Sequence, residues 1–498
     1  MKRFNTILNM EKYFEKFRKN TVGNNKKYLS PDGRKMIIYA DWVASGRLYK
    51  PLEDRAAKVI GPYVANTHTE ASETGTLMTR AYHLAQKKIK EHCNAGKDDV
   101  IITAGFGMTT VINKFQRILG LKVNVKLNLA RFKSKDDKPV VFITHMEHHS
   151  NQTSWYETAA DVVVLEPGKD LQCSLKNLEK ALKKYKNRKI KYGSFSACSN
   201  VTGIQPPYHA MAKLMHKYGG YCFVDFAASA PYVDIDMHPK DKAEKLDAIF
   251  FSPHKFLGGP GTSGVMIFDR ALYTNYTPDQ PGGGTVEWTN PWGEYKYIED
   301  IEIREDGGTP GFLQAIRAAL CIELKNEMGV KNILKREEEL LKIAFKELRK
   351  IPHLHILADD IEHRLGIVSF YIDKIHYNLI VRLLSDRYGV QVRGGCACAG
   401  TYGHYLLDVD HKHSREITEL INHGDLSLKP GWVRLSLHPT MTNEELYIVC
   451  NALKEIQKNY ETWKEDYDYK NHTNEFYHKS GKKYSVDVNE WFAELTTV

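Results

Sequence analysis

The alternation of short apolar runs with helical repeats through the first two thirds of this chain most constrains its fold. Short apolar runs are typical of buried strands, and helical repeats between them indicate crossover connections. The predicted strands are 100–103, 139–144, 161–166, 192–197, 221–227 and 247–252, and the predicted helices are 79–93, 109–119, 175–186 and 208–219. Because crossovers of this kind join parallel strands, the sequence predicts an α/β domain with a largely parallel sheet.

Two stretches rich in glycine and proline, 277–285 and 306–311, interrupt this alternation. The long helical stretches, apolar runs and glycine–cysteine loop that follow are typical of an α+β domain. The sequence therefore predicts two domains flanked by extensions. The expected segments are an N-terminal extension over 1–37, a large domain over 38–310, a small domain with the cysteine loop over 311–459 and a C-terminal extension over 460–498.

Composition and charge exclude several classes of protein. Hydrophobic residues make up 42% of the chain and charged residues 26%, which excludes collagen-like and largely disordered proteins. The formal net charge of +9 is spread over 498 residues, so we expect no nucleic-acid partner. No apolar run reaches the ~18 residues that a transmembrane helix needs, so we expect no membrane insertion.

Two features favour a cytoplasmic location. Glu11 and Glu15 interrupt the N-terminal stretch, which argues against a secretory signal. The eight cysteines are sparse and form no disulfide framework, which favours a reducing compartment. We therefore expect a cytoplasmic protein.

The sharpest local signal is the segment FFSPHKFLGGPG at 250–261, where an apolar strand ends at Ser252 and leads through His254 and Lys255 into a glycine loop. A lysine at such a strand end can form a Schiff base once burial lowers the pKa of its amine. Taken alone, the His254–Lys255 pair is more often a surface lysine before a turn.

Asp225 closes another apolar run, YCFVD. A buried carboxylate needs a cationic partner, and a protonated pyridine nitrogen would serve as one. Considered alone, Asp225 is more simply a helix cap or a member of an ordinary salt bridge.

A glycine turn at Gly105 and Gly107 joins the strand at 100–103 to a helix that opens near Met108 and Thr109. The free backbone N–H groups of a helix start bind anions. The turn lacks a P-loop lysine, so it favours a phosphorylated cofactor over ATP. Turns of this kind are common, and this one is a weak signal by itself.

Together these motifs resemble the class V, fold-type I pyridoxal-phosphate enzymes, and most closely their cysteine desulfurase and selenocysteine lyase branch. The resemblance runs from about residue 38 to about residue 455 and rests on several motifs in order. Besides those above, they are IYADWVASG (38–46), THMEHHSNQTSW (144–155), SACSNVTGIQPP (196–207), DGGTPG (306–311) and WVRLSL (432–437). The resemblance implies a large domain with a mostly parallel sheet, a smaller α+β domain, and pyridoxal 5'-phosphate as cofactor.

The resemblance also implies a role for each matching residue. Lys255 would be the Schiff-base lysine, Asp225 the partner of the ring nitrogen, and His148 a catalytic residue stacked on the ring. The expected cofactor-binding residues are Lys255, Gly107, Met108, Thr109, His148, Asn200, Asp225, Ser252, His254 and Thr309. Thr309 lies in the segment that crosses the subunit interface in this family, so the resemblance implies a homodimer.

The loop RGGCAC at 393–398 matches the family pattern R-x-G-x-x-C. The match implies that Cys398 is the catalytic nucleophile and that Arg393 binds the substrate beside Arg434, which matches the arginine for the substrate carboxylate. The guanidinium fork of arginine suits a carboxylate. Cys396 and Ala397 stand where the family often has histidines, which leaves a different class V reaction open.

A second departure concerns the cofactor. Ala228 stands where the family has a glutamine that contacts the phenolic oxygen of the cofactor, and Ser229 is the neighbouring candidate for that contact.

The two cysteines also have rival interpretations. A zinc site would need a second Cys/His pair at a usable spacing, so we expect no metal. A disulfide between Cys396 and Cys398 would be strained. Two small side chains that pack a glycine loop are the simplest structural alternative.

The leading function is conversion of L-cysteine to L-alanine with a persulfide formed on Cys398. The expected partners are then an amino-acid substrate and a sulfur-acceptor protein. The alternative is a class V aminotransferase, or a related lyase or epimerase, that acts on another amino acid and in which Cys398 is structural. A non-catalytic scaffold is a third option, and the presence of Lys255, Asp225 and Asn200 argues against it.

Overall fold

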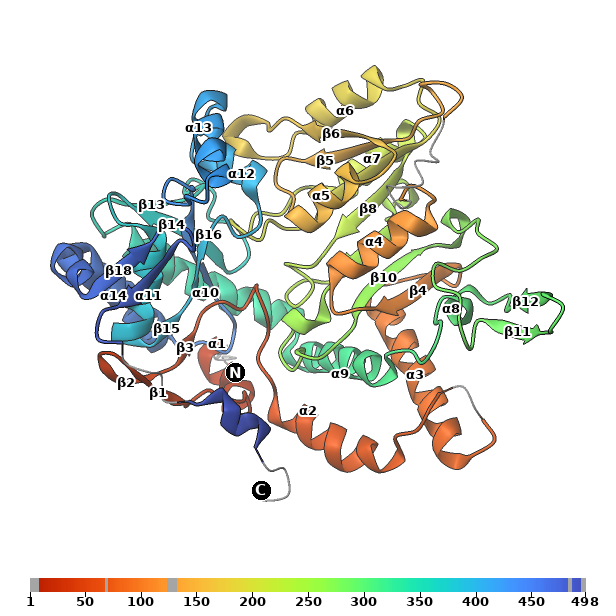
Figure 1. Cartoon of the computed structure of the whole chain (residues 1–498), viewed down its shortest axis with the longest axis horizontal. Helices are drawn as coiled ribbons and strands as arrows, with labels where there is room; N and C mark the ends of the chain where they lie inside the picture. The colour runs from red at the N-terminus through yellow and green to blue at the C-terminus, as the bar shows by residue number, and fades with distance from the viewer. Residues whose placement is uncertain (1–8, 68–69, 123–131, 482–485, 494–498) are drawn as a thin grey trace, which may run out of the picture. The chain divides into compact units, whose positions relative to one another are not determined.

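The structure, a computed structural model, describes residues 9–67, 70–122, 132–481 and 486–493 (Figure 1). The chain divides into two compact units. The larger unit comprises Val43–Asn200 and Ile204–Leu334, and the smaller unit comprises Met1–Trp42, Val201–Gly203 and Lys335–Val498. The predicted division of the chain into four segments stays a prediction.

A seven-stranded sheet forms the centre of the larger unit. Across the sheet its strands are β4 (Asp99–Ala104), β10 (Gly264–Asp269), β9 (Ala248–Phe251), β8 (Tyr221–Asp225), β7 (Lys191–Ser196), β5 (Val140–Thr144) and β6 (Asp161–Leu165). The pairs from β9 to β6 are parallel, and β10 is antiparallel to both of its neighbours. The predicted α/β fold with a mostly parallel sheet is therefore confirmed. The reversed strand β10 was not predicted.

Helices cover this sheet because its strands are apolar on both faces. The helices of the larger unit are α2 (Lys50–Arg55), α3 (Glu73–His92), α4 (Met108–Ile118), α5 (His149–Tyr156), α6 (Leu175–Lys184), α7 (Tyr208–Lys217), α8 (Ile301–Arg304) and α9 (Phe312–Met328), with a hairpin of β11 (Val286–Thr289) and β12 (Tyr295–Tyr297). Phe115 of α4 packs edge-on against Phe223 and Phe250, at 5.1 and 5.3 Å between ring centroids. This aromatic core fixes α4, and with it the turn that precedes α4, on the sheet.

The smaller unit has an antiparallel sheet in the order β13 (Leu354–Ile356), β14 (Ile367–Ile372), β17 (Trp432–Ser436) and β16 (Arg393–Gly395). Its helices are α1 (Met10–Lys19), most of α10 (Val330–Leu348), α11 (Tyr377–Tyr388), α12 (Gly400–Leu406), α13 (His411–Asn422) and α14 (Asn443–Trp463). Its remaining strands are β1 (Lys27–Ser30), β2 (Gly33–Met36), β3 (Ile38–Tyr39), β15 (Val390–Gln391), β18 (Tyr467–Lys470) and β19 (Glu475–His478). The unit is thus of the predicted α+β type.

The two extensions contribute ordered elements to the smaller unit. Helix α1 buries Phe14 and Phe17, and Arg18 on its last turn forms an ion pair with Glu445 of α14 at 2.7 Å. At the other extension, β18 and β19 form an antiparallel hairpin. No element was predicted in either region.

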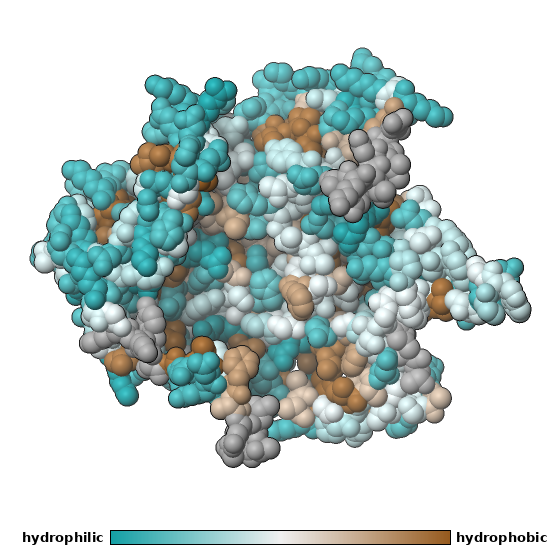
Figure 2. Space-filling model, viewed as in Figure 1, coloured by the Kyte–Doolittle hydropathy of each residue, from teal (hydrophilic) through white to brown (hydrophobic). Residues whose placement is uncertain are grey.

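Within the described residues, every helix is too short or too polar to cross a membrane. Hydrophilic residues cover most of the face drawn in Figure 2, and hydrophobic residues form smaller, separate patches between them.

Candidate active site

Most of the predicted cofactor-binding residues of the larger unit lie where strands of its sheet end. Strands β4, β5, β7, β8 and β9 all run in the same direction, so their carboxyl ends meet at one edge. Open parallel sheets bind their ligands at this edge. The predicted residues that lie at or just after these strand ends are Gly107, Met108, Thr109, His148, Asn200, Asp225, Ser252, His254 and Lys255.

Asp225 is the last residue of β8 and is only 5% exposed. Its carboxylate accepts a hydrogen bond from the backbone N–H of Ala227 at 2.8 Å. Burial raises the pKa of Asp225 to about 7, and the positive charge of Lys255 opposes this rise. A further cation near this carboxyl would stabilise its charged form, which is poorly solvated in the interior.

Glu147, which the sequence analysis did not single out, is a second buried carboxylate at this edge. Burial raises its pKa, whereas hydrogen bonds to its charged form oppose the rise. The side chain accepts hydrogen bonds from the hydroxyls of Thr144 and Ser196, both at 2.6 Å, and from the amide of Asn151 at 2.8 Å. These bonds tie the ends of β5 and β7 to α5. They fix the turn that carries the next residue, His148.

His148 is the N-cap of α5, where its Nδ1 accepts a hydrogen bond from the N–H of Ser150 at 3.1 Å. The ring is therefore held by the helix start that follows it. The hydroxyl of Ser150 lies 2.6 Å from that of Thr109, which stands in the first turn of α4. The segments that carry His148 and Thr109 are thus adjacent.

Lys255 ends a short 3₁₀ turn, Pro253–Lys255, directly after β9. His254 beside it is half-buried, and burial together with the charge of Lys255 lowers the pKa of His254 to about 4. The imidazole is therefore neutral at pH 7. Gly46 approaches this turn closely, since a Cβ on it would lie 1.8 Å from the carbonyl oxygen of Phe256.

The glycine turn before α4 contacts the same segment. The hydroxyl of Ser252 accepts a hydrogen bond from the N–H of Met108 at 2.8 Å, and a Cβ on Gly107 would lie 3.0 Å from that hydroxyl. Gly105 has a φ of +55°, which favours glycine. The structure therefore brings Gly107 and Met108 together with Ser252 and His254.

These residues fit pyridoxal phosphate. The buried carboxyl of Asp225 suits a protonated ring nitrogen, and Lys255 is close enough to influence its pKa. The exposed Thr109 and the start of α4 suit a phosphate.

Ser229 is fully buried, and its hydroxyl has no hydrogen-bond partner in the described part of the chain. Thr309 is exposed and lies 3.4 Å from the amide of Asn66.

The predicted substrate-binding and nucleophilic residues lie in the smaller unit. Arg434 on β17 is almost fully buried and donates to the carboxylate of Asp41 at 2.7 Å. Arg393 on β16 contacts the other oxygen of the same carboxylate at 3.3 Å. Asp41 has no role in the sequence analysis, which quoted it only within the motif at 38–46.

Cys398 is exposed, whereas Cys396 is half-buried. Ala397 and Cys398 have φ values of +50° and +57°, a conformation that residues other than glycine seldom adopt. Such strain is found where the surrounding structure requires an unusual backbone, often at functional sites. A thiolate at Cys398 would raise the pKa of Arg434, although burial lowers that pKa more strongly. Cys398 therefore lies within electrostatic reach of Arg434.

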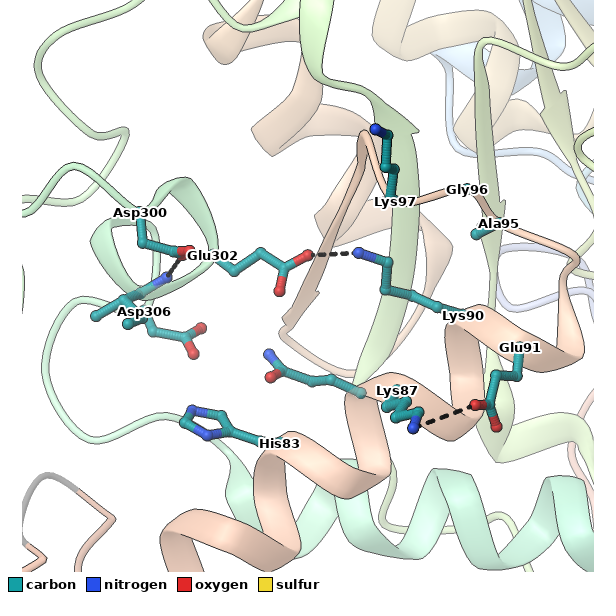
Figure 3. Close-up of a pocket in the computed structure, with 12 residues that line it drawn as sticks. His83, Lys87, Lys90, Glu91, Ala95, Gly96, Lys97, Asp300, Glu302 and Asp306 are labelled. Carbon is teal, nitrogen blue, oxygen red and sulfur yellow. Dashed lines mark hydrogen bonds and ion pairs between the residues drawn. The ribbon is translucent and has the colours of Figure 1, made fainter.

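The described residues contain no cluster of three or more His, Cys, Asp or Glu side chains that could hold a metal ion. A separate cavity of about 460 Å³ lies between α3 and α8, near the start of β4 (Figure 3). In Figure 3, His83 and Lys90 of α3 face Glu302 and Asp306, and Lys90 pairs with Glu302 at 3.0 Å. The described residues that line this cavity include no predicted site residue.

Comparisons with known proteins place the sequence among those of one family. A sequence model of the family described as aminotransferase class-V matches residues 38–449. A protein of Halalkalibacterium halodurans named as a probable cysteine desulfurase is 29% identical over 368 residues, which is 73% of this chain and 84% of the relative. A probable cysteine desulfurase of Staphylococcus epidermidis is 30% identical over 342 residues, 68% of this chain and 77% of the relative.

The fold also matches solved structures. The apo structure of a cysteine desulfurase from Thermococcus onnurineus superposes with a TM-score of 0.70 and 22% sequence identity, over 89% of this chain and 98% of the other. At this level of identity the likeness shows the shared fold.

The raised pKa of Asp225 predicts a pH-dependent effect on the stability of the cofactor-free protein. Between pH ~4 and ~7 the unfolded carboxyl is ionised while the folded one keeps its proton, so stability falls as pH rises through this window. Replacing Asp225 with asparagine removes this loss. The variant should be more stable than the wild type by roughly 2–4 kcal/mol at pH 8, and by less at pH 5.

Thermal melts of the cofactor-free proteins at both pH values check this prediction. Asp98→Asn, which removes an exposed carboxyl from the same unit, is the control. If the gain in stability of Asp225→Asn over the wild type is no greater at pH 8 than at pH 5, Asp225 is not desolvated as described.

Proposed function

Because the chain belongs to the aminotransferase class-V family, whose members are pyridoxal-phosphate enzymes, we propose that it is a cysteine desulfurase. In this proposal it converts L-cysteine to L-alanine and leaves the sulfur on Cys398. The observation that carries the proposal is the exposed Cys398 on a strained loop, within electrostatic reach of the buried Arg434. Relatives named as probable cysteine desulfurases support it.

The larger unit would hold the cofactor at the carboxyl edge of its sheet. Asp225 would bind the ring nitrogen, and His148, held at the start of α5, would lie against the ring. Ser252, His254 and the first turn of α4, which are already in contact, would bind the phosphate. Asn200 would complete the ring contacts. Pyridoxal phosphate, when bound, supplies an electron sink for the α-carbon of the amino acid.

Lys255 is the proposed acid–base residue. Its Nζ would take the proton from Cα of the substrate and later return a proton to the product. The neutral ring of His254 places no second positive charge beside this amine at pH 7. Arg434 and Arg393 would bind the carboxylate of the substrate through their guanidinium groups.

Cys398 is the proposed nucleophile. Its thiolate would attack the sulfur of the substrate, so that an S–S bond forms while the Cβ–S bond of the substrate breaks. The electron pair of the broken bond stays with Cβ, which is then protonated. L-cysteine and the Cys398 thiol thereby give L-alanine and a Cys398 persulfide. A thiol of an acceptor protein would then remove the outer sulfur.

We expect Cys398→Ser to abolish the release of sulfide and alanine from L-cysteine in the presence of a thiol reductant, because the attacking thiolate is lost. Cys396→Ser, a matched change two residues away, should retain most of the activity. Alanine and sulfide are measured side by side in all three proteins. Loss of activity only in Cys396→Ser would contradict the proposed register. Amino transfer to an α-keto acid without sulfide release would favour the aminotransferase alternative.

We propose further that the enzyme is a homodimer in which Thr309 contributes to the phosphate site of the partner. The proposal rests on the resemblance of the segment 306–311 and on the exposure of Thr309 in the larger unit. Thr309→Ala should weaken cofactor binding by about tenfold, since one phosphate contact is lost. The control is Thr76→Ala, a change of the same type on α3.

Fluorescence titration with pyridoxal phosphate measures the affinity for the cofactor, and sedimentation over a dilution series measures the oligomeric state. A monomer that binds the cofactor tightly would contradict the shared site.

We also propose a cytoplasmic location. The eight cysteines, all within the described residues, form no disulfide, which is typical of proteins in a reducing compartment. Cell fractionation checks this proposal, and recovery from an oxidising compartment would overturn it.

A further inference from the structure

Two arginines face each other directly across neighbouring strands of the smaller unit. Arg393 of β16 and Arg434 of β17 are register partners in the antiparallel pair. Like charges at directly opposite positions destabilise a sheet, and burial of Arg434, whose side chain is 4% exposed, increases the cost. This arrangement therefore requires an anion beside both guanidinium groups.

Asp41 supplies that anion from a distant part of the sequence. One carboxylate oxygen lies 2.7 Å from Arg434 and the other lies 3.3 Å from Arg393. The side chain of Asp41 is 14% exposed, so the pair that it forms with Arg434 is largely shielded from water. Shielding strengthens the interaction relative to a surface ion pair.

The backbone around Asp41 is fixed on both sides. Strand β3 pairs in parallel with β15, and the N–H of Ala40 donates to the carbonyl of Gln391 at 2.9 Å. On the other side, Asp41 forms a β-bridge with Ser436, whose N–H donates to the carbonyl of Ala40 at 2.8 Å. The carboxylate is thus presented by a clamped backbone, and its position does not depend on a mobile loop.

The charge balance of this cluster matters for Cys398. Two guanidinium groups and one carboxylate leave one excess positive charge, and Cys398 lies within electrostatic reach of Arg434 and is exposed. The number of carboxylates therefore sets the net charge of the cluster.

We propose that Asp41 is a positioning residue that holds the guanidinium groups of Arg393 and Arg434 and leaves this three-residue cluster with one excess positive charge. A cluster with one excess charge matches an amino acid that carries a single carboxylate and a neutral side chain. The part of the proposal that concerns substrate choice rests on the proposed desulfurase function, whereas the part that concerns charge does not.

The charge is tested in the cofactor-free protein, in a Cys396→Ser background that leaves one thiol in the loop. The rate at which iodoacetamide alkylates Cys398 is followed against pH by peptide mass spectrometry. Asp41→Asn leaves two excess charges, so the rate at pH 7 should rise by about threefold or more. Asp41→Glu, which keeps the charge, should restore a rate near that of the wild type.

Glu475→Gln is the matched control. Glu475 and Asp41 line the same cavity of about 360 Å³, but Glu475 is exposed and forms no ion pair with either arginine within the described residues. This variant should leave the alkylation rate unchanged. If Asp41→Asn does not fold, Arg393→Gln serves as a second variant. It removes one positive charge, so it should slow the alkylation of Cys398 rather than speed it. An unchanged or opposite response would overturn the proposal.

Substrate choice is tested in the holoenzyme by inhibition of cysteine turnover with L-alanine and with L-aspartate. In Asp41→Asn the inhibition constant of L-aspartate should fall by about fivefold relative to that of L-alanine. The extra positive charge favours binding of the second carboxylate of aspartate. The KM for L-cysteine should rise, since the arginines lose their common support. A lower KM would instead identify Asp41 as a competitor of the substrate, and would overturn the positioning role.

The two proposals can fail separately. A wild-type holoenzyme that releases no sulfide from L-cysteine would refute the desulfurase function, and the alkylation experiment would still decide the charge role of Asp41.

Discussion

The cost of burying charged side chains governs the functional parts of this structure. In the larger unit, Asp225 ends a strand inside the protein, and burial raises the pKa of its carboxyl to about 7. In the smaller unit, Arg434 is buried on a strand and is compensated by Asp41. Each of these charges is destabilising unless an opposite charge is near it. The chain supplies that charge for Arg434, and for Asp225 a cationic ring nitrogen would supply it.

The parallel sheet determines where this chemistry can occur. Strands that run in one direction bring their carboxyl ends to one edge, and residues far apart in sequence meet there. Glu147 joins two of these ends through Thr144 and Ser196. It therefore supports His148 and adds a second buried negative charge that raises the pKa of Asp225.

The sequence alone was sufficient for the features that rest on local patterns. Apolar runs and helical repeats predicted the parallel strands and the helices between them, and the proposed site residues Asp225 and Lys255 lie at or just after the ends of two of these strands. Strand β10 follows directly on a glycine-rich loop and was not assigned as a strand, and its antiparallel direction depends on pairing with β4 and β9. Glu147 was missed because hydrogen bonds with distant residues give it its role. The pairing of Asp41 with Arg434 joins positions 393 residues apart, which no local pattern shows. Helix α1 was missed although its buried residues Met10, Phe14 and Phe17 follow the helical spacing of four and three residues.

The central claim is that Cys398 accepts the sulfur of L-cysteine. The most direct test is mass spectrometry of the holoenzyme after brief incubation with L-cysteine, followed by alkylation and digestion. We expect one additional sulfur atom on Cys398 and none on Cys396 in a protein that also forms an equal amount of L-alanine. Alanine formation without sulfur on Cys398, or added sulfur only on Cys396, would contradict the claim.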